Sequence, residues 1–547
     1  MTIKYTKEQL NKFDKDLLIE LFLGMQGQME ELSRQTQALN DRMQLMMEQM
    51  VLFQKNRFGR FSEKMADSEQ IRFMEVDGTI VFFNEAEAVC DLDAPEPDDL
   101  ELKAPKKKKQ PGKKAADIAG LTVKRIDHYL KEEELTAEFG ENGWKQLPDA
   151  ISRCYQFIPA SVVIEEHHIG VYSSKLDEHM IKAPHPRNLL HGSLVSPSLA
   201  AAVINGKYVN AVPLYRLEKE FERYGLAITR QNMANWMIRL GEEYLGTMYD
   251  YLHKLLYDYH VIQADETPVL VNKDGRPAGS QSYMWVYRSG FMYRDRQIIL
   301  YEYQKTRNAS HPREFLRDYT GICVTDGYQV YHTLEKEREN LKIAGCWVHC
   351  RRRFNDALEV IPKAHRKESI LHLIMKQIQA IYREEGKLSD FSTEDRLMQR
   401  QLVVKPLVDA FFAYLKQNEP KIPKNGKIRE AFTYALNQES YLKVFLEDGD
   451  VPIDNNASER AIRGFCIGKK NWEMIDTVNG ANSSAIIYSI AETAKANNLK
   501  PFDYFEYLLT EIPKHVDDKN TDFLAELLPW SDMLPENIRK PQKASGK

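Results

Sequence analysis

Apolar residues recur every seven positions near the N-terminus, and no proline interrupts the segment. The repeated positions are Leu18, Met25, Leu32, Leu39, Met46 and Phe53. This period predicts a helix that forms a coiled coil. The alternate core positions include three glutamines and an arginine, so the pairing is expected to be weak. An amphipathic helix that packs against its own chain is the alternative.

A second helical pattern covers residues 198–245 and contains a short turn. Gly225 suits the left-handed end of one helix, and Thr229 suits the N-cap of the next. The pattern predicts a helix-turn-helix whose second helix presents polar side chains to DNA bases. These candidate contacts are Arg230, Gln231, Asn232 and Asn235. A plain helical hairpin fits the same pattern.

Beyond residue 255 the pattern changes to strands. Segments 261–271, 282–289 and 296–303 are apolar and β-branched, and turn-forming residues separate them. We expect a short helix at 311–319 and a buried strand at 321–331. Three strands, a helix and a further strand form the element order of a ribonuclease H-like core.

This order brings two aspartates to one edge of the expected sheet. Asp265 lies on the first strand, and Asp326 follows the neighbouring fourth strand. Two carboxylates that lie close together repel each other unless a cation sits between them, so the pair favours Mg²⁺. Taken singly, each aspartate fits equally well as a strand-ending or turn residue.

A third carboxylate comes from residues 452–472, which predict a helix that starts at the Asp454-Asn455-Asn456 run. Glu459 on this helix would complete the metal site. Cations and an amide on the same segment are candidate contacts to DNA phosphates: Asn456, Arg460, Arg463, Lys469 and Lys470. An exposed helix with an internal ion pair is the alternative, but it does not explain why so many cations surround one acid.

Two divalent ions held by Asp265, Asp326 and Glu459 would support phosphodiester chemistry without a covalent enzyme intermediate. One ion lowers the pKa of an attacking water or 3′-hydroxyl, and the other stabilises the leaving oxygen. We therefore expect two Mg²⁺ ions as the cofactor, with Mn²⁺ as a substitute.

More than 130 residues separate Asp326 from Glu459, far more than a simple connection needs. Their helical periodicity predicts an all-α insertion over residues 348–450. Cys346, His349 and Cys350 lie at its entrance. Zinc needs about four ligands, so three local ones favour structural packing. The neighbouring cations are further candidate DNA contacts: His349, Arg351, Arg352 and Arg353.

Composition narrows these interpretations. The 547 residues are 43% hydrophobic and 28% charged, which predicts several soluble domains. No apolar stretch is long enough to span a membrane and the N-terminus is too polar for a signal peptide, so we expect a cytoplasmic protein. Six scattered cysteines suit reduced thiols. The net charge of −5 excludes a protein that coats nucleic acid indiscriminately, so DNA contacts must be local.

Several long motifs resemble the large transposase of the insertion sequence 66 family, over nearly the whole chain. They are RFGRFSEK (57–64), KYVNAVPLYRLEKEFERYGLAITRQNMANW (207–236), ADETPV (264–269), TDGY (325–328), GCWVHCRRRF (345–354), DNNASERAIRGFCIGKKNW (454–472) and ELLPW (526–530). The resemblance implies a ribonuclease H-like domain with an Asp-Asp-Glu triad at Asp265, Asp326 and Glu459. It also implies magnesium-dependent DNA transposition, small accessory proteins, and a supporting role for Cys346 and His349.

One departure from this family concerns zinc. Members commonly carry a cysteine-based zinc module before the helix-turn-helix, but between Leu121 and Gly192 this chain has only Cys154 as a thiol. Four thiolate ligands are therefore not available, and no zinc is expected. The segment is expected to keep the module's β-rich shape.

The sequence thus predicts a multidomain α+β protein with a ribonuclease H-like catalytic core and an all-α insertion, preceded by a coiled coil and a helix-turn-helix. The expected segments are a coiled coil (1–60), a small β-containing segment (61–90), a charged linker (91–118), a degenerate zinc-module-like domain (119–190), the helix-turn-helix domain (191–250), the first part of the core (251–347), the insertion (348–450), the second part of the core with the Glu459 helix (451–512) and a C-terminal tail (513–547). The linker holds seven lysines between Lys103 and Lys114, which fit either a solvated connection or an arm that contacts DNA phosphates.

The favoured hypothesis is a bacterial, DNA-associated transposase that binds element ends and double-stranded target DNA. We expect it to form a homodimer or higher oligomer, to work with accessory proteins of the same element, and to have no membrane partner. A catalytically silent, repurposed DNA-binding copy is one alternative. Another is a coiled-coil and helix-turn-helix regulator whose strand-rich middle binds a ligand or dimerises.

Overall fold

The computed structural model describes residues 73–76, 79–82, 130–140, 160–173, 180–184, 187–277, 279–290, 292–518 and 520–541. The expected coiled coil and charged linker lie outside these residues. The chain divides into two compact units. The larger unit contains Arg187–Leu217 and Thr229–Leu534, and the smaller contains Ala66–Pro186, Glu218–Ile228 and Pro535–Lys547.

The smaller unit contains short elements. They are β1 (Phe73–Val76), β2 (Thr79–Phe82), α4 (Glu132–Phe139), β3 (Val171–Ser173) and β4 (Met180–Lys182). β1 pairs with β2, and β3 pairs with β4, both antiparallel. The described part of the segment that was expected to be β-rich, 119–190, therefore holds one helix and one two-stranded sheet.

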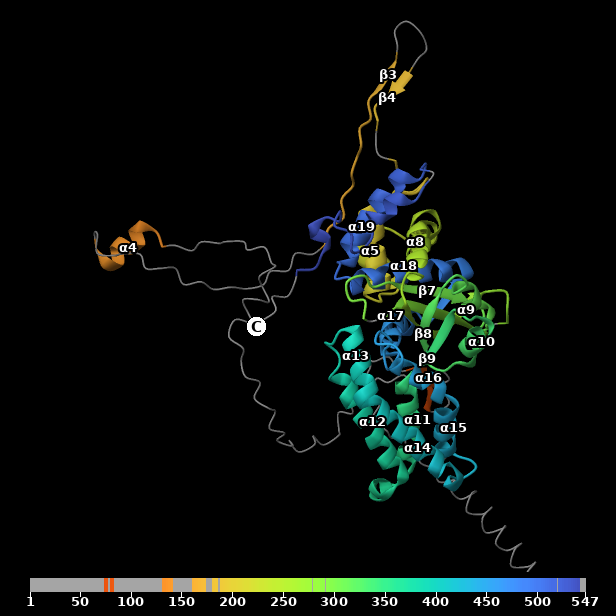
Figure 1. The fold of residues 1–547 in the computed structure, drawn as a ribbon. Helices are drawn as coiled ribbons and strands as arrows, with labels where there is room; N and C mark the ends of the chain where they lie inside the picture. The colour runs from red at the N-terminus through yellow and green to blue at the C-terminus, as the bar shows by residue number, and fades with distance from the viewer. Residues whose placement is uncertain are drawn as a thin grey trace, which may run out of the picture. The chain divides into compact units, whose positions relative to one another are not determined.

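A six-stranded mixed sheet forms the centre of the larger unit (Figure 1). Its strands are β5 (Val261–Lys273), β6 (Gln281–Ser289), β7 (Ile299–Gln304), β8 (Gly321–Thr325), β9 (Leu341–Gly345) and β10 (Met474–Thr477). The order is β7-β6-β5-β8-β9, and β10 pairs with the far end of β5. β6 pairs antiparallel with both β5 and β7, whereas β8 and β10 pair parallel with β5, and β9 pairs parallel with β8.

The expected strand at 321–331 is wrong in its second half. β8 ends at Thr325, and residues Gln329–Glu337 form helix α10. Gly327 breaks the strand, because its φ of 90° is a left-handed conformation that favours glycine. A Cβ at this position would lie 3.0 Å from the Tyr434 hydroxyl. The apolar pattern continues through this break, so periodicity alone did not reveal it.

Helices cover the outer edge of β7 and gather at one end of the unit. They include α5 (Pro197–Ile204), α8 (Gly246–Leu256), α18 (Val478–Ala496) and α19 (Pro501–Glu511) (Figure 1). Two hydroxyls of α18 bind the edge directly: Ser489 accepts the Tyr301 N–H at 2.7 Å, and Thr493 accepts the Ile299 N–H at 2.9 Å. These bonds satisfy backbone groups that an open strand edge would leave unpaired.

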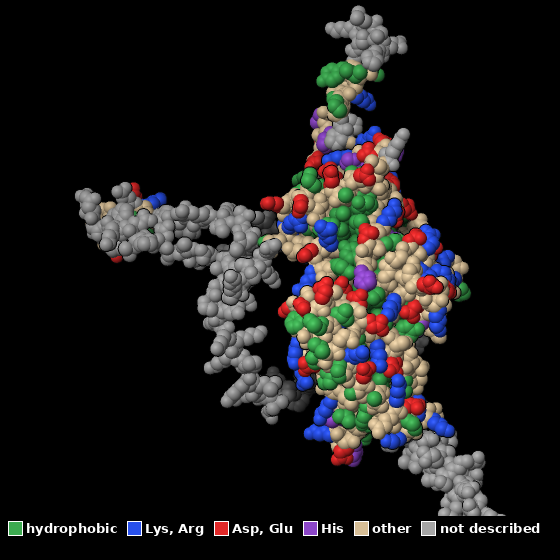
Figure 2. Space-filling model, in the orientation of Figure 1, with side chains coloured by type: hydrophobic (Ala, Val, Ile, Leu, Met, Phe, Trp, Pro, Cys, Tyr) green, Lys and Arg blue, Asp and Glu red, His purple; other side chains and the backbone are tan. Residues whose placement is uncertain are grey.

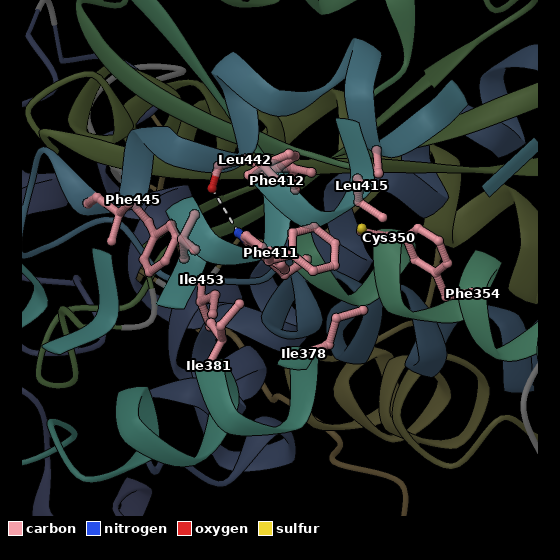
Figure 3. Packing of buried hydrophobic residues seen from close by; sticks show 14 of the residues in the cluster. Cys350, Phe354, Ile378, Ile381, Phe411, Phe412, Leu415, Leu442, Phe445 and Ile453 are labelled. Carbon is pink, nitrogen blue, oxygen red and sulfur yellow. Dashed lines mark hydrogen bonds between the residues drawn. The ribbon is translucent and has the colours of Figure 1, made fainter. Parts of the chain in front are cut away.

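The chain between β9 and residue 446 is helical and gathers at the other end of the unit (Figure 1). Its main helices are α11 (Trp347–Val360), α12 (Ile370–Gly386), α13 (Thr393–Gln399), α14 (Lys405–Asn418), α15 (Lys427–Asn437) and α16 (Glu439–Lys443). Phe354, Phe411 and Phe412 pack among aliphatic side chains in their core (Figure 3). The same core includes Val261 and Val324 of the sheet, so the insertion packs continuously onto the strands.

The C-terminal residues of the larger unit pack into its core. Leu524, Leu527 and Leu534 are buried, and the Tyr504 hydroxyl of α19 donates to the Leu527 carbonyl at 2.8 Å. The segment expected to be a C-terminal tail thus contributes to the core up to this point. In the described part of the chain, no helix combines the length and apolar character needed to cross a membrane.

Candidate active site

Two of the predicted carboxylates belong to neighbouring parallel strands: Asp265 lies on β5, and Asp326 directly follows β8. Gln263 of β5 is in register with Val324 of β8, so continuing both strands by two residues brings Asp265 level with Asp326. Burial raises the pKa of Asp265 well above its ordinary value, and the negative charges of Glu266, Asp326 and Glu459 raise it further. The carboxylates of Asp265, Asp326 and Glu459 therefore interact, although they come from three distant parts of the sequence.

Helix α17 (Asn456–Trp472), which carries Glu459, lies across a gap on one edge of β5. β8 pairs with β5 only at residues 261–263, and β10 pairs with it only from Leu270 onward. Between them, Asn455 donates through its side-chain amide to the Ala264 carbonyl at 2.7 Å. Lys469 donates to the Pro268 carbonyl at 2.6 Å. Both ends of α17 are thus fastened to the strand that bears Asp265.

Asn455 has a role that the sequence did not reveal. The helix starts where it was predicted, but the Asn455 side chain makes no capping hydrogen bond. Its carbonyl oxygen instead accepts from the Gln263 amide at 3.1 Å, and its backbone N–H donates to the Cys346 sulfur at 3.2 Å. Asn455 and Gln263 are both fully buried. The start of α17 is therefore held against β5 and against the beginning of α11.

Glu459 lies one turn into α17 and faces α11. Its Oε2 is 3.6 Å from Nη2 of Arg352, and its Oε1 is 3.9 Å from Nε2 of His349. Oε1 is buried and has no hydrogen-bond partner among the described residues. Glu459 therefore keeps one carboxylate oxygen available at the site.

His349 lies between two of the carboxylates. Burial lowers its pKa, and the charge of nearby Arg352 acts in the same direction. The charges of Asp326 and Glu459 oppose this shift, which places His349 near both acids. Its Nδ1 is buried and without a hydrogen-bond partner in the part of the chain that is described.

The cysteines beside His349 contribute to packing. Cys346 and Cys350 are buried, and burial raises the pKa of Cys346 to about 12, so both remain thiols. Within the described ranges, no group of three or more His, Cys, Asp or Glu side chains is arranged so that it could hold a metal ion. The carboxylates of Asp265, Asp326 and Glu459 thus interact electrostatically without forming a closed ligand set.

Two charged residues near the site, Glu266 and Arg307, were not found from the sequence. Arg307 donates to the Glu266 carboxylate through Nε at 2.7 Å. Burial raises the pKa of Glu266 to about 7, Asp326 adds to this rise, and Arg307 opposes it. The adjacent acid in the Asp265-Glu266 pair was the only local signal, because Arg307 is 41 residues away in a polar loop.

The candidate phosphate contacts on α11 and α17 differ in how far their side chains are exposed. Arg351, Arg352 and Arg353 of α11 are exposed, as are Arg460, Arg463 and Lys470 of α17. Asn456 instead donates to Asp454 at 2.9 Å, and Lys469 is half-buried against β5. On the face drawn in Figure 2, basic and acidic side chains are interspersed.

The turn between α6 (Leu214–Arg223) and α7 (Arg230–Leu240) has the predicted local features. Gly225 adopts a φ of 81°, and the Thr229 hydroxyl accepts the Asn232 N–H at 3.2 Å. The candidate base contacts at the start of α7 are exposed: Arg230, Gln231, Asn232 and Asn235. The other end of α7 is anchored, because Ser483 of α18 donates to the Met237 carbonyl at 2.5 Å.

Comparison with known proteins assigns the chain to a family. A family model described as "Transposase IS66 family" matches residues 192–483, which include Asp265, Asp326 and Glu459. "IS66 C-terminal element" matches residues 489–530, and "Transposase C of IS166 homeodomain" matches residues 45–126.

Two relatives come from Sinorhizobium fredii. Uncharacterized protein y4qI is 28% identical over 369 residues, which is 66% of this chain and 67% of that protein. Uncharacterized protein y4jD is 24% identical over 433 residues, or 76% of this chain and 82% of its own length. Because the first family model covers more than half of the sequence, the chain belongs to the IS66 transposase family.

Proposed function

We propose that this protein is a DNA transposase that binds the ends of its element and cuts and joins DNA strands at Asp265, Asp326 and Glu459. One observation carries the proposal. The register of β5 with β8 and the fastening of α17 to β5 bring three acids from distant parts of the chain into electrostatic contact. These acids all lie within the part of the chain that matches the family model.

The strand order supports a ribonuclease H-like catalytic core. Three antiparallel strands are followed by two that add in parallel beside the first, giving β7-β6-β5-β8-β9. In this arrangement, Asp265 lies on the central strand and Asp326 follows its parallel neighbour. The helical insertion separates Asp326 from Glu459 along the chain without separating the strands.

The donor set fits a hard divalent cation. All three side chains offer carboxylate oxygens, and Glu459 keeps a buried oxygen without a partner. Burial raises the pKa of Asp265, and the neighbouring carboxylates add a repulsion that a cation would relieve. Because no three donors are assembled as a ligand set, binding requires the carboxylates to draw closer. Two Mg²⁺ ions, or Mn²⁺ in their place, would lower the pKa of the attacking water or hydroxyl and stabilise the leaving oxygen.

The proposed chemistry has two steps. In nicking, a water oxygen bonds to phosphorus, the bond from phosphorus to the 3′ oxygen breaks, and that oxygen takes a proton while the water loses one. The free 3′-hydroxyl then attacks a phosphodiester of target DNA, whose own 3′ oxygen leaves. Asn455 and Lys469 keep Glu459 near β5 throughout, and His349 and Arg352 orient its carboxylate.

DNA binding is proposed for separate surfaces of the chain. The exposed polar residues at the start of α7 would contact bases, and the exposed arginines of α11 and α17 would contact phosphates. The homodimer or higher oligomer would form through the N-terminal heptad repeat. Accessory proteins of the same element would act with this complex.

A nicking assay tests the proposal. The substrate is a duplex taken from the DNA that flanks the gene, incubated with purified protein and Mg²⁺. Asp265→Asn, Asp326→Asn and Glu459→Gln should each abolish nicking and leave duplex binding largely intact. Asp318→Asn is the matched control, because Asp318 is exposed and should leave nicking unchanged. Wild-type cleavage by the first three variants would reject the assignment, and binding without nicking by the wild type would indicate a silent copy.

A further inference from the structure

Arg307 lies in the loop between β7 and α9 (Ser310–Phe315) and is held on one edge by Glu266. Its Nε donates to Oε1 of Glu266 at 2.7 Å, and its Nη2 donates to the same oxygen. The Glu266 side chain is only 2% exposed, whereas that of Arg307 is 39% exposed. The guanidinium group therefore has one buried edge and one edge that reaches the surface.

Tyr328 fixes the same arginine from a second direction. The guanidinium carbon lies 3.8 Å from the centre of the Tyr328 ring. The Tyr328 hydroxyl donates to the Arg307 carbonyl at 2.6 Å, and the Tyr328 N–H donates to Oδ1 of Asp326 at 2.9 Å. Tyr328 thus links Arg307 to Asp326. Few side-chain conformations remain open to Arg307, so little entropy is lost when it binds a ligand.

The remaining edge of Arg307 suits an anion. Among the described residues, Nη1 of Arg307 makes no hydrogen bond that would occupy it. A planar guanidinium with an open edge matches the oxygens of a phosphate group, and it does so better than a lysine ammonium. Tyr328 connects this arginine to Asp326, so a DNA strand bound at Asp326 would lie close to Arg307.

The negative charge around this arginine also favours a cation at this position. Asp265 interacts with Glu266, Asp326 and Glu459, and Glu266 also interacts with Asp326. Oε2 of Glu266 is buried without a partner in the described part of the chain. These acids repel the phosphates of an approaching DNA strand. Arg307 offsets this repulsion beside Glu266 and close to Asp326.

We propose that Arg307 binds a DNA phosphate next to the one that is cut, with Glu266 and Tyr328 as its positioning residues. The inference rests on the proposed function, since it assumes that DNA enters the carboxylate site. It adds a binding residue outside the Asp-Asp-Glu set and outside the arginines of α11 and α17. The ligand is a phosphodiester oxygen, recognised without regard to base sequence.

The salt dependence of DNA binding tests this proposal. Affinity for the flanking duplex is measured with Ca²⁺ in place of Mg²⁺, over a range of salt concentrations. The logarithm of the binding constant falls as the logarithm of the salt concentration rises. Loss of one phosphate contact should make this slope less steep by about 0.9. Arg307→Gln should show this change together with a several-fold loss of affinity. Arg317→Gln, at an exposed arginine paired with Glu314, should keep the wild-type slope.

A second pair of variants guards against misfolding. Arg307→Gln leaves the buried Glu266 carboxylate without its cation. The salt dependence of the double variant Glu266→Gln/Arg307→Gln is therefore compared with that of Glu266→Gln alone. The slope for the double variant should be less steep than the slope for Glu266→Gln, by the same amount. Equal slopes in this pair would overturn the proposal and leave Arg307 as a neutraliser of Glu266. If the wild type neither nicks nor binds the duplex, the proposed function fails as well; if it does both, only the role of Arg307 is at stake.

Discussion

The first turns of α17 and α7 both carry polar side chains proposed to act on DNA, but the two helices are held in different ways. α17 is fastened before its first turn by the buried amide of Asn455, which bonds to β5. α7 begins with a local cap from Thr229, and the polar side chains after it are exposed. Catalysis requires side chains fixed within a fraction of an ångström, whereas contacts to DNA tolerate adjustment on binding.

This comparison predicts that stability and activity depend most on the attachment of α17. Asn455→Ala removes two buried hydrogen-bonding atoms and leaves Gln263 and the Ala264 carbonyl without this partner. We expect a loss of about 2–4 kcal/mol in the free energy of unfolding, because each buried polar group that is left without a hydrogen-bond partner costs roughly 1–3 kcal/mol. Nicking should fall in parallel, since Glu459 moves with the helix. Urea unfolding followed by tryptophan fluorescence and the nicking assay measure the two effects.

The control for that change is Asn456→Ala, one residue further along. The Asn456 side chain is half-buried and bonds only to neighbouring Asp454 in the described structure. Its loss should cost less than about 1 kcal/mol. Equal destabilisation by the two alanine variants would show that attachment to β5 is not what distinguishes α17.

The second attachment of α17 should matter less. Lys469→Met removes the hydrogen bond to the Pro268 carbonyl but keeps the apolar stem of the side chain. We expect a loss of about 1 kcal/mol in stability and a few-fold decrease in nicking. Lys470→Met, at the exposed neighbour, is the control and should leave the unfolding midpoint unchanged. If Lys469→Met unfolds at the same midpoint as its control and nicks at the wild-type rate, the second attachment has no role.

The smallest effect on nicking is expected at the start of α7. Thr229→Ala removes the N-cap and should cost about 1 kcal/mol locally. DNA affinity should fall, while the nicking rate of saturated complexes should stay at the wild-type level. Thr229→Ser keeps the capping oxygen and should restore affinity. A reduced rate at saturation would mean that α7 affects the carboxylate site directly.

Local patterns were sufficient to predict much of the sheet. The apolar, β-branched segments gave β5, β6 and β7 close to their observed bounds, and the chain is a mixed α+β protein as expected. The pattern failed at Gly327, where a tight turn interrupts an apolar run. It also missed β10, a four-residue strand of alternating exposed and half-buried residues that pairs with the end of β5.

The sequence named the candidate site residues one at a time, but it did not reveal the contacts that hold them. Asp265 was indicated by its place on the first strand, Asp326 by the end of the fourth and Glu459 by the first turn of a helix, and the family resemblance implied the same three residues. Asn455 looked like an ordinary capping residue, because its partners Gln263 and Ala264 lie almost two hundred residues earlier. Arg307 was missed for the same reason, since its pairing with Glu266 depends on how β7 and β5 are arranged.

The central claim is that three separate carboxylates form one cation site, and Mn²⁺ binding tests it most directly. Electron paramagnetic resonance of free Mn²⁺ gives the affinity for wild type, Asp265→Asn, Asp326→Asn, Glu459→Gln and the Asp318→Asn control. The account predicts that each site variant binds Mn²⁺ at least tenfold more weakly, and that combining two variants costs less than the sum of the single losses. Wild-type affinity in Glu459→Gln, or fully additive losses, would contradict a shared site.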